Sequence, residues 1–243
     1  MLMVSEMFYS IQGEGPHAGV PAVFLRLTGC NLTCKGFSYK DPVTKEHLGC
    51  DTKNIWMQGK KVRPSDLLDT WQEKGWIEKL KRGAHLIITG GEPLLQSPGL
   101  LSTLEFLKRA MGPLFIELET NGTIDLTDEL MPFMTHINVS PKLDIAGDPF
   151  TKRYRKKSLS TFASLSQAHF KFVISSESDI QEIQERYSIP FNIPCDRIWL
   201  MSEGATTSEL MAQERQVVEW GKHYGYGFSP RLHIHLWGNI PGV

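Results

Sequence analysis

Three cysteines near the amino terminus could bind a metal ion or an iron–sulfur cluster. Cys30 and Cys34 stand four residues apart in GCNLTC, and Cys50 closes the stretch KGFSYKDPVTKEHLG, whose polar composition is typical of an exposed loop. Three thiolates from one loop can hold zinc or an iron–sulfur cluster, and a set of three leaves one metal position open for chemistry. The alternative is that Cys30 and Cys34 are core residues, because free cysteine is among the most buried residue types. The fourth cysteine, Cys195, lies far along the chain, and we expect it to be structural.

A pair of glycines follows an apolar run in LIITGGEP, residues 86 to 93. Glycines after a strand allow positive φ and let the backbone approach a ligand closely, and Glu92 adds an acceptor. The alternative is a tight turn between a strand and a helix. GGEP differs from the GxGxxG dinucleotide signature, and the chain has no GxxxxGK(S/T) phosphate loop. We therefore expect a different class of ligand.

Short apolar runs alternate with segments of helical period along the chain. The expected strands are 22–27, 85–89, 114–119, 136–140, 169–174, 197–201 and 231–237. Helices are expected from about 65 to 80, from Ser97 with Pro98 at its first turn, from about 178 to 187 and from about 207 to 224. Strands alternating with helices imply a parallel sheet with right-handed crossovers.

Polar motifs follow the expected strands at their carboxyl ends: TGC, TGGEP, ETNG, SPK and MSEGAT. Ligands gather at such ends in parallel sheets, so these motifs are expected to form one site. A closed barrel of eight units takes about 250 residues, and this chain spends many residues on loops. We therefore expect an α/β fold, an incomplete TIM-like barrel of about six βα units. No repeat or linker divides the sequence, which indicates a single domain over residues 1–243.

Composition favours a small-molecule substrate in a reducing compartment. The formal net charge of -1 gives no basic footprint for nucleic acid. The amino terminus has no basic segment before its apolar residues, and no apolar run approaches the roughly 18 residues that span a bilayer. We expect a cytoplasmic protein that binds neither nucleic acid nor membrane, in which disulfides are rare.

With these motifs in place, the chain resembles the 7-carboxy-7-deazaguanine synthase family of radical S-adenosylmethionine enzymes. The resemblance runs from EMFYSIQGEGPHAGVPAVFLRLTGCNLTC through CDTK, ITGGEPLLQ, ELETNGTI, NVSPK, FKFVI and LMSEGAT to RLHIHLWGN. GGEP alone points to the superfamily, whereas QGEG before the cysteines and CDT after them point to the synthase. In the family pattern the third cysteine comes three residues after the second. Here residues 35–49 are inserted, so Cys50 is taken as the third ligand.

The resemblance implies the chemistry. Cys30, Cys34 and Cys50 would bind three irons of a [4Fe-4S] cluster, and the fourth iron would bind S-adenosylmethionine, whose reductive cleavage yields a 5'-deoxyadenosyl radical. The substrate would be 6-carboxy-5,6,7,8-tetrahydropterin, converted to 7-carboxy-7-deazaguanine with loss of ammonia on the way to queuosine. An electron donor such as flavodoxin or ferredoxin is expected, and so is a homodimer.

The resemblance also implies roles for individual residues. The cofactor-binding residues would be Gly90, Gly91, Glu92, Glu119, Ser140, Lys142 and Met201. The substrate-binding residues would be Gln12, Gly13, Glu14, Arg26, Thr89 and His235. Thr52 would bind Mg²⁺ together with substrate oxygens, since magnesium keeps several non-protein ligands. Arg26 lies among apolar strand residues and needs a partner there, which would be the substrate carboxylate.

Each role has a plainer alternative. Glu119 and Lys142 could form a surface ion pair, and Asp51 with Thr52 could cap a helix or form a turn. His233 and His235, on one face of the last expected strand, could both be structural. Basic residues between 152 and 157 are most simply a solvated loop.

Two other functions remain open at this point. One is another radical enzyme, such as a glycyl-radical activase, which shares the cysteines and GGEP but acts on a protein. The other is a zinc-stabilised binding module, which needs a fourth ligand from Cys195 or a histidine.

Overall fold

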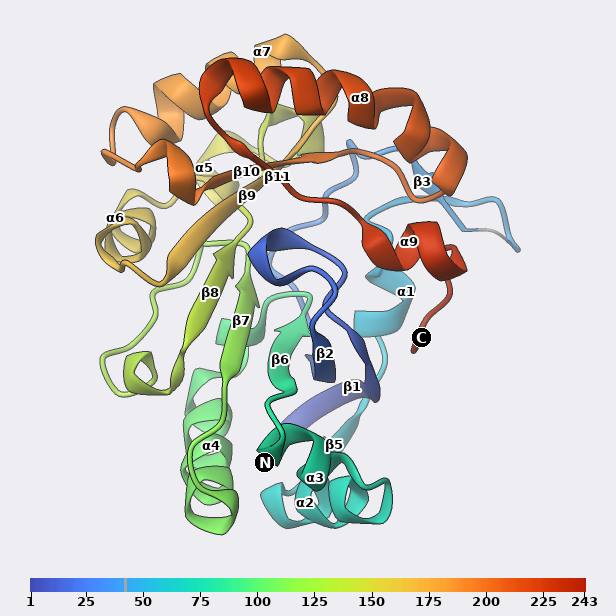
Figure 1. The fold of residues 1–243 in the computed structure, drawn as a ribbon, viewed down its shortest axis with the longest axis vertical. Coiled ribbons are helices and arrows are strands. Elements are labelled where there is room, and N and C mark those ends of the chain that lie inside the picture. Colours follow the sequence, from blue (N-terminus) through green and yellow to red (C-terminus); the bar gives the residue numbers. More distant parts are fainter. Residues whose placement is uncertain (42) are drawn as a thin grey trace.

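The computed structural model describes residues 1–41 and 43–243. Within them, one mixed sheet of nine strands forms the centre of the molecule (Figure 1). Its order is β11 (Gly227–Phe228), β10 (Ile198–Ser202), β9 (Ala168–Ile174), β8 (His136–Val139), β7 (Ile116–Thr120), β6 (His85–Gly90), β2 (Pro21–Leu27), β1 (Leu2–Ile11) and β5 (Lys60–Val62). The ladder from β2 to β11 is parallel, whereas β1 runs antiparallel to both of its neighbours. The predicted α/β class is therefore confirmed, with an antiparallel edge added.

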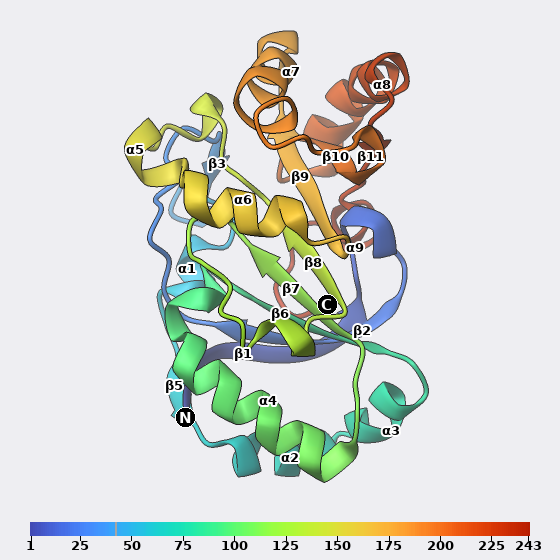
Figure 2. The ribbon, with the colours of Figure 1, turned by 90° about the vertical axis from the view of Figure 1, so that its left-hand side faces the viewer.

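Helices cover the outer face of this sheet (Figure 2). The longer ones are α2 (Pro64–Glu73), α3 (Trp76–Lys81), α4 (Ser97–Met111), α6 (Lys156–Ser164), α7 (Glu177–Ile183) and α8 (Thr207–Tyr224). The short ones are α1 (Lys53–Trp56), α5 (Phe150–Arg153) and α9 (Leu232–Trp237). Single turns are η1 (Gly15–His17), η2 (Pro93–Gln96), η3 (Met131–Phe133), η4 (Asp144–Ala146), η5 (Gln184–Ser188) and η6 (Cys195–Arg197), and a small hairpin pairs β3 (Tyr39–Lys40) with β4 (His47–Gly49). Among the described residues, no helix is both long and apolar enough to cross a bilayer.

The two faces of the parallel strands differ in chemistry because successive side chains point to opposite sides. The outward residues are apolar and fully buried against the helices, as Ile88, Leu118 and Phe172 illustrate. Each such side chain stabilises the fold by about 1.5–3 kcal/mol when buried. The inward residues are largely polar, and Glu119 and Lys171 on this face bond to each other across the sheet. The outer face therefore carries the core, and the inner face is available for chemistry.

Six of the seven predicted strands are confirmed, and the last is wrong. Residues 232–237 form helix α9, in which only Ile234 is buried. Alternation over so short a segment cannot by itself distinguish a strand from a helix, because its apolar positions fit both the strand period of two and the helical period of 3.6. The predicted helix of residues 65–80 is two helices, since Gly75 adopts a φ of 68° between α2 and α3.

The basic residues between 152 and 157 are exposed as predicted, except Arg153, and the stretch is partly helical. It contains the end of α5 and the start of α6, and the Arg153 side chain is only 1% exposed. Its guanidinium pairs with Glu182 at 2.6 Å and with Asp144. Arg153 therefore anchors α5 to α7, which a sequence read locally does not indicate.

Candidate active site

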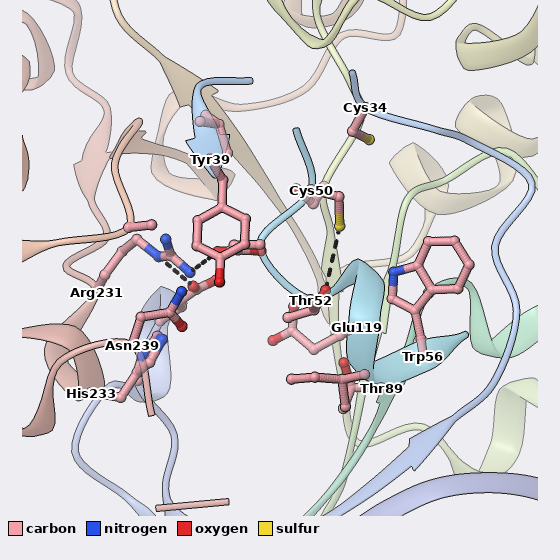
Figure 3. Close-up of a pocket in the computed structure, with 18 of the residues that line it drawn as sticks. Cys34, Tyr39, Cys50, Thr52, Trp56, Thr89, Glu119, Arg231, His233 and Asn239 are labelled. Carbon is pink, nitrogen blue, oxygen red and sulfur yellow. Dashed lines mark hydrogen bonds and ion pairs between the residues drawn. The ribbon is translucent and has the colours of Figure 1, made fainter. Parts of the chain in front are cut away.

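A cavity of about 310 Å³ lies over the carboxyl ends of the parallel strands (Figure 3). Most of the residues predicted for the site line it: Gln12, Gly13, Glu14, Arg26, Cys30, Cys34, Cys50, Thr52, Thr89, Gly90, Gly91, Glu119, Ser140, Lys142 and Met201. Two of the predicted residues, Glu92 and His235, are not part of its lining. The fold thus brings together the motifs that follow separate strands, as the strand-end argument predicts.

The loop after β2 presents the first two cysteines to the cavity. Asp148, which is 6% exposed, accepts hydrogen bonds from the Thr33 and Cys34 amides at 2.9 and 2.7 Å. Cys34 itself has a φ of 48°, a conformation that a non-glycine residue adopts rarely. On the other side, a Cβ added to Gly91 would lie 2.5 Å from the Cys30 Cβ, so only glycine allows this approach. Two neighbouring segments therefore fix the loop that carries the thiols.

The inserted residues return the chain to this loop. After the β3–β4 hairpin, Gly49 packs so closely that an added Cβ would meet the Cys34 carbonyl oxygen at 2.3 Å. Cys50 follows, and its Sγ lies 3.4 Å from Thr52 Oγ1 (Figure 3). Thr52 precedes α1 but its side chain does not cap that helix. The hairpin thus places the third thiol on the same cavity wall as the first two.

Burial disfavours the ionised form of two of the three thiols. Burial raises the pKa of Cys30, and it raises the pKa of Cys34 to about 12 although the Lys142 ammonium lies nearby. Such thiols ionise at neutral pH only when a metal compensates the charge. Cys195 is exposed at η6 and does not line the cavity, so it is not placed to be a fourth ligand.

Glu92 braces the site from behind and does not face the cavity. Its fully buried carboxylate accepts bonds from Thr120 Oγ1 and from the amides of Leu94 and Asn121, the last at 2.7 Å. Burial raises its pKa to about 7 despite these donors. Glu92 therefore joins the GGEP loop to the end of β7, and its contact with the cofactor stays a prediction.

A buried ion network forms the floor of the cavity. Lys171 on β9 lies 2.6 Å from Glu14 and 3.1 Å from Glu119, and Arg231 lies 3.1 Å from Glu14. Burial would lower the pKa of Lys171, but the two carboxylates raise it well above its ordinary range. Burial likewise would raise the pKa of Glu14, yet Lys171 and Arg231 hold it well below its ordinary value. Glu14, Lys171 and Arg231 are therefore charged at neutral pH, whereas burial raises the pKa of Glu119.

Arg231 connects this floor to the cysteine loop. Its guanidinium also pairs with Asp51 at 2.6 Å, next to Cys50 (Figure 3). One side chain thus fixes the distance between Glu14 and the third thiol.

Several predicted partnerships are different in the structure. Arg26 lines the cavity, but its Nε donates to Glu6 at 2.7 Å, so a protein carboxylate already supplies its partner. Glu119 and Lys142 do not pair with each other, since Lys142 donates to Ser140 at 2.9 Å. In α9, His235 pairs with Glu214 outside the cavity.

Sequence reasoning missed several polar residues that line the cavity, among them Lys171, Arg231 and Ser202, and it left open which of His233 and His235 faces the site. A lysine inside the apolar run FKFVI was a signal for Lys171, because a charge in a buried strand requires partners. Several buried side-chain atoms of the described residues have no hydrogen-bond partner, and Trp56 Nε1 and Ser202 Oγ are two of them. Both line the cavity and are free to bind a ligand.

The chain is similar to known enzymes along nearly its whole length. No family model matches the chain. It is 34% identical to the 7-carboxy-7-deazaguanine synthase of Pyrobaculum aerophilum, with 98% of this chain and 96% of the relative aligned. The synthases of Hyperthermus butylicus and Halobacterium salinarum are 32% and 31% identical over 96% and 99% of this chain, and over 92% of each relative.

A solved structure has the same fold. The crystal structure of QueE from Escherichia coli superimposes with a TM-score of 0.61 at 24% identity, covering 94% of this chain and 92% of that one. The full-length identity to the curated relatives confirms the resemblance seen in the motifs: the chain belongs to the 7-carboxy-7-deazaguanine synthase family.

Proposed function

We propose that this chain is a radical S-adenosylmethionine enzyme that forms 7-carboxy-7-deazaguanine from 6-carboxy-5,6,7,8-tetrahydropterin with loss of ammonia, in queuosine biosynthesis. The observation that carries the proposal is one cavity with three thiols on its wall and a charged, buried floor. The name of the relatives supports the same product. An enclosed site of this kind suits a small molecule better than the protein substrate of an activase.

The cysteine wall fits a [4Fe-4S] cluster. Cys30, Cys34 and Cys50 would be its ligands, since all three line the cavity and Gly49, next to Cys50, packs directly against Cys34. When bound, the cluster and S-adenosylmethionine supply the one-electron chemistry that removes a substrate hydrogen atom. The protein's own task is to orient the substrate and to exclude other hydrogen donors.

Residues between the wall and the floor would hold S-adenosylmethionine. The Gly90 and Gly91 backbone lines the cavity and would approach the methionine end. Both positions require glycine, because an added Cβ would meet the Leu27 or Gly29 carbonyl oxygen at 2.3 Å, so this loop packs tightly against the loop after β2. Lys142, held by Ser140, offers a positive charge for a carboxylate. Met201 offers an apolar contact to the adenine from the end of β10.

The floor would bind the pterin. Gln12 donates to Glu119 at 3.0 Å and its own backbone groups bond to Val20 and Gly19, so the Glu14 carboxylate would read the edge of the ring with its remaining lone pairs. Among the described residues, Arg26 is paired only through Nε, so its terminal nitrogens can donate to the substrate carboxylate. Thr89 faces the same cavity. His233 takes the place that was predicted for His235.

The proposal has further parts. Thr52 would bind Mg²⁺ together with substrate oxygens. Its hydroxyl does not cap α1 and lies beside Cys50, which supports this role. The parallel strands would form a partial barrel in a single domain, supported by the inward polar face. The protein would act in the cytoplasm as a homodimer, with flavodoxin or ferredoxin as electron donor.

Product analysis tests the proposed function. Anaerobically reconstituted protein is incubated with the carboxytetrahydropterin, S-adenosylmethionine and reductant, and the products are identified by mass spectrometry. We expect 7-carboxy-7-deazaguanine and ammonia, and neither when S-adenosylmethionine is omitted. Cleavage of S-adenosylmethionine with the pterin left intact would refute the substrate while leaving the superfamily in place.

A further inference from the structure

A second cluster of ligand-type side chains lies at the opposite ends of the strands from the cavity. His85 is the first residue of β6, Glu117 the second of β7 and His17 the last of η1. His17 Nδ1 lies 3.0 Å from Glu117 Oε1, and His85 Nδ1 bonds to the same oxygen. The three ligand atoms lie within 4.8 Å of one another. None of these residues lines the cavity, so the cluster is distinct from the proposed active site.

The donor set matches a transition metal. Two imidazole nitrogens and one carboxylate oxygen form a common zinc set, in which the fourth position is left to water. Imidazole also discriminates against magnesium and calcium, which prefer oxygen ligands. The His17 side chain is 28% exposed, so an ion can reach the cluster and small rotations of this ring can complete the geometry.

The surroundings hold the three ligands in place as a metal site requires. Ligating carboxylates are themselves hydrogen-bonded in such sites. Here the other Glu117 oxygen, Oε2, accepts from Asn138 at 3.2 Å and from Gln12 at 3.4 Å, which leaves Oε1 for the cluster. The Phe115 ring stacks on His85 with centroids 3.8 Å apart and fixes the orientation of that imidazole.

Charge gives the second argument. Glu117 is fully buried, and its partners among the described residues are two amides and two imidazoles, none of them a permanent cation. A buried carboxylate whose partners carry no permanent charge is stabilised by a bound cation.

We propose that His17, His85 and Glu117 bind a divalent first-row transition ion, with zinc as the expected occupant. The ion would join η1 to β6 and β7. Because η1 directly follows Gln12 and Glu14, which extend into the floor of the cavity, metal binding would hold the substrate end of the active site in place. The site would be structural, and it does not depend on the proposed reaction.

Zinc titration of the holoenzyme tests the site. Protein with its cluster assembled is freed of loosely bound metal, mixed with Zn²⁺ and desalted, and its zinc is counted beside its iron. We expect one zinc per chain in the wild type and in His223→Gln, which changes an exposed histidine on α8. We expect none in His17→Gln or Glu117→Gln, with the iron content unchanged. If Glu117→Gln does not fold, His17→Gln carries the test, because its ring is partly exposed.

X-ray absorption at the zinc edge identifies the ligands. Nitrogen and oxygen scatterers with imidazole features, lost in His17→Gln, would support the site. A sulfur shell would place the zinc on the cysteines and overturn the proposal. Equal zinc contents in the wild type and His17→Gln would also overturn the proposal. His17, His85 and Glu117 would then form a hydrogen-bonded cluster without a metal.

Discussion

Replacing Lys171 by methionine tests whether the floor of the cavity is a true buried ion network. The ammonium is 3% exposed and neutralises both Glu14 and Glu119. Removing one partner from a buried pair costs about 3–5 kcal/mol, because it leaves charge uncompensated. Arg231 still faces Glu14, so the loss falls mainly on Glu119 and is expected at the lower end, about 3 kcal/mol. The matched control is Lys222→Met, whose exposed pair with Glu219 is worth about 0–1 kcal/mol.

The pH dependence sharpens this test. In the wild type the pKa of Glu14 lies below its unfolded value, so its contribution is present above that unfolded value and is lost as the pH falls. Without Lys171 the pKa values of Glu14 and Glu119 rise, and protonation at lower pH relieves the uncompensated charge. Urea unfolding followed by circular dichroism should therefore show a smaller loss at pH 5 than at pH 8. A loss below about 1 kcal/mol, equal at both pH values, would refute the network.

Three further changes probe the site. Burial raises the pKa of Glu92 to about 7. The free energy of unfolding therefore falls as the pH rises from the unfolded pKa of this carboxyl to its folded pKa. Glu92→Gln should remove this pH-dependent loss, up to about 3 kcal/mol, when urea unfolding is measured as a function of pH. Asp148→Asn should lower the iron content of reconstituted protein, because the Cys34 amide loses its carboxylate acceptor. Arg231→Gln should lower kcat/KM by a factor equivalent to a loss of about 2–5 kcal/mol of transition-state stabilisation. Arg231→Lys should not restore kcat/KM, since an ammonium cannot bridge Glu14 and Asp51 in the same geometry.

The sequence was most informative where a strand ends in a polar motif. Apolar runs such as 85–89 identify strands because both hydrophobic period and flanking glycines agree. The same reasoning missed β1, a ten-residue strand in which most residues are only half-buried and Glu6 interrupts the apolar pattern. Residues 231–237 were misread because α9 is too short for period to decide.

The sequence predicted most of the residues that line the cavity, but it did not predict which of them form ion pairs with one another. Residues in motifs at strand ends meet because parallel strands share one edge. The partner of Lys171, in contrast, lies 157 residues away at Glu14, and no local pattern encodes that contact. For the same reason Arg26 was assigned to the substrate, although Glu6 on the neighbouring strand faces it.

The most direct test of the proposed cluster site compares Cys50, after the inserted residues 35–49, with Cys195. Wild type, Cys50→Ala and Cys195→Ala are reconstituted anaerobically, and iron content is measured together with formation of 7-carboxy-7-deazaguanine. If Cys50 is the third cluster ligand, Cys50→Ala loses both the cluster and the product. Cys195→Ala keeps both, because Cys195 is exposed and does not line the cavity. Loss of the cluster in Cys195→Ala with retention in Cys50→Ala would contradict this assignment.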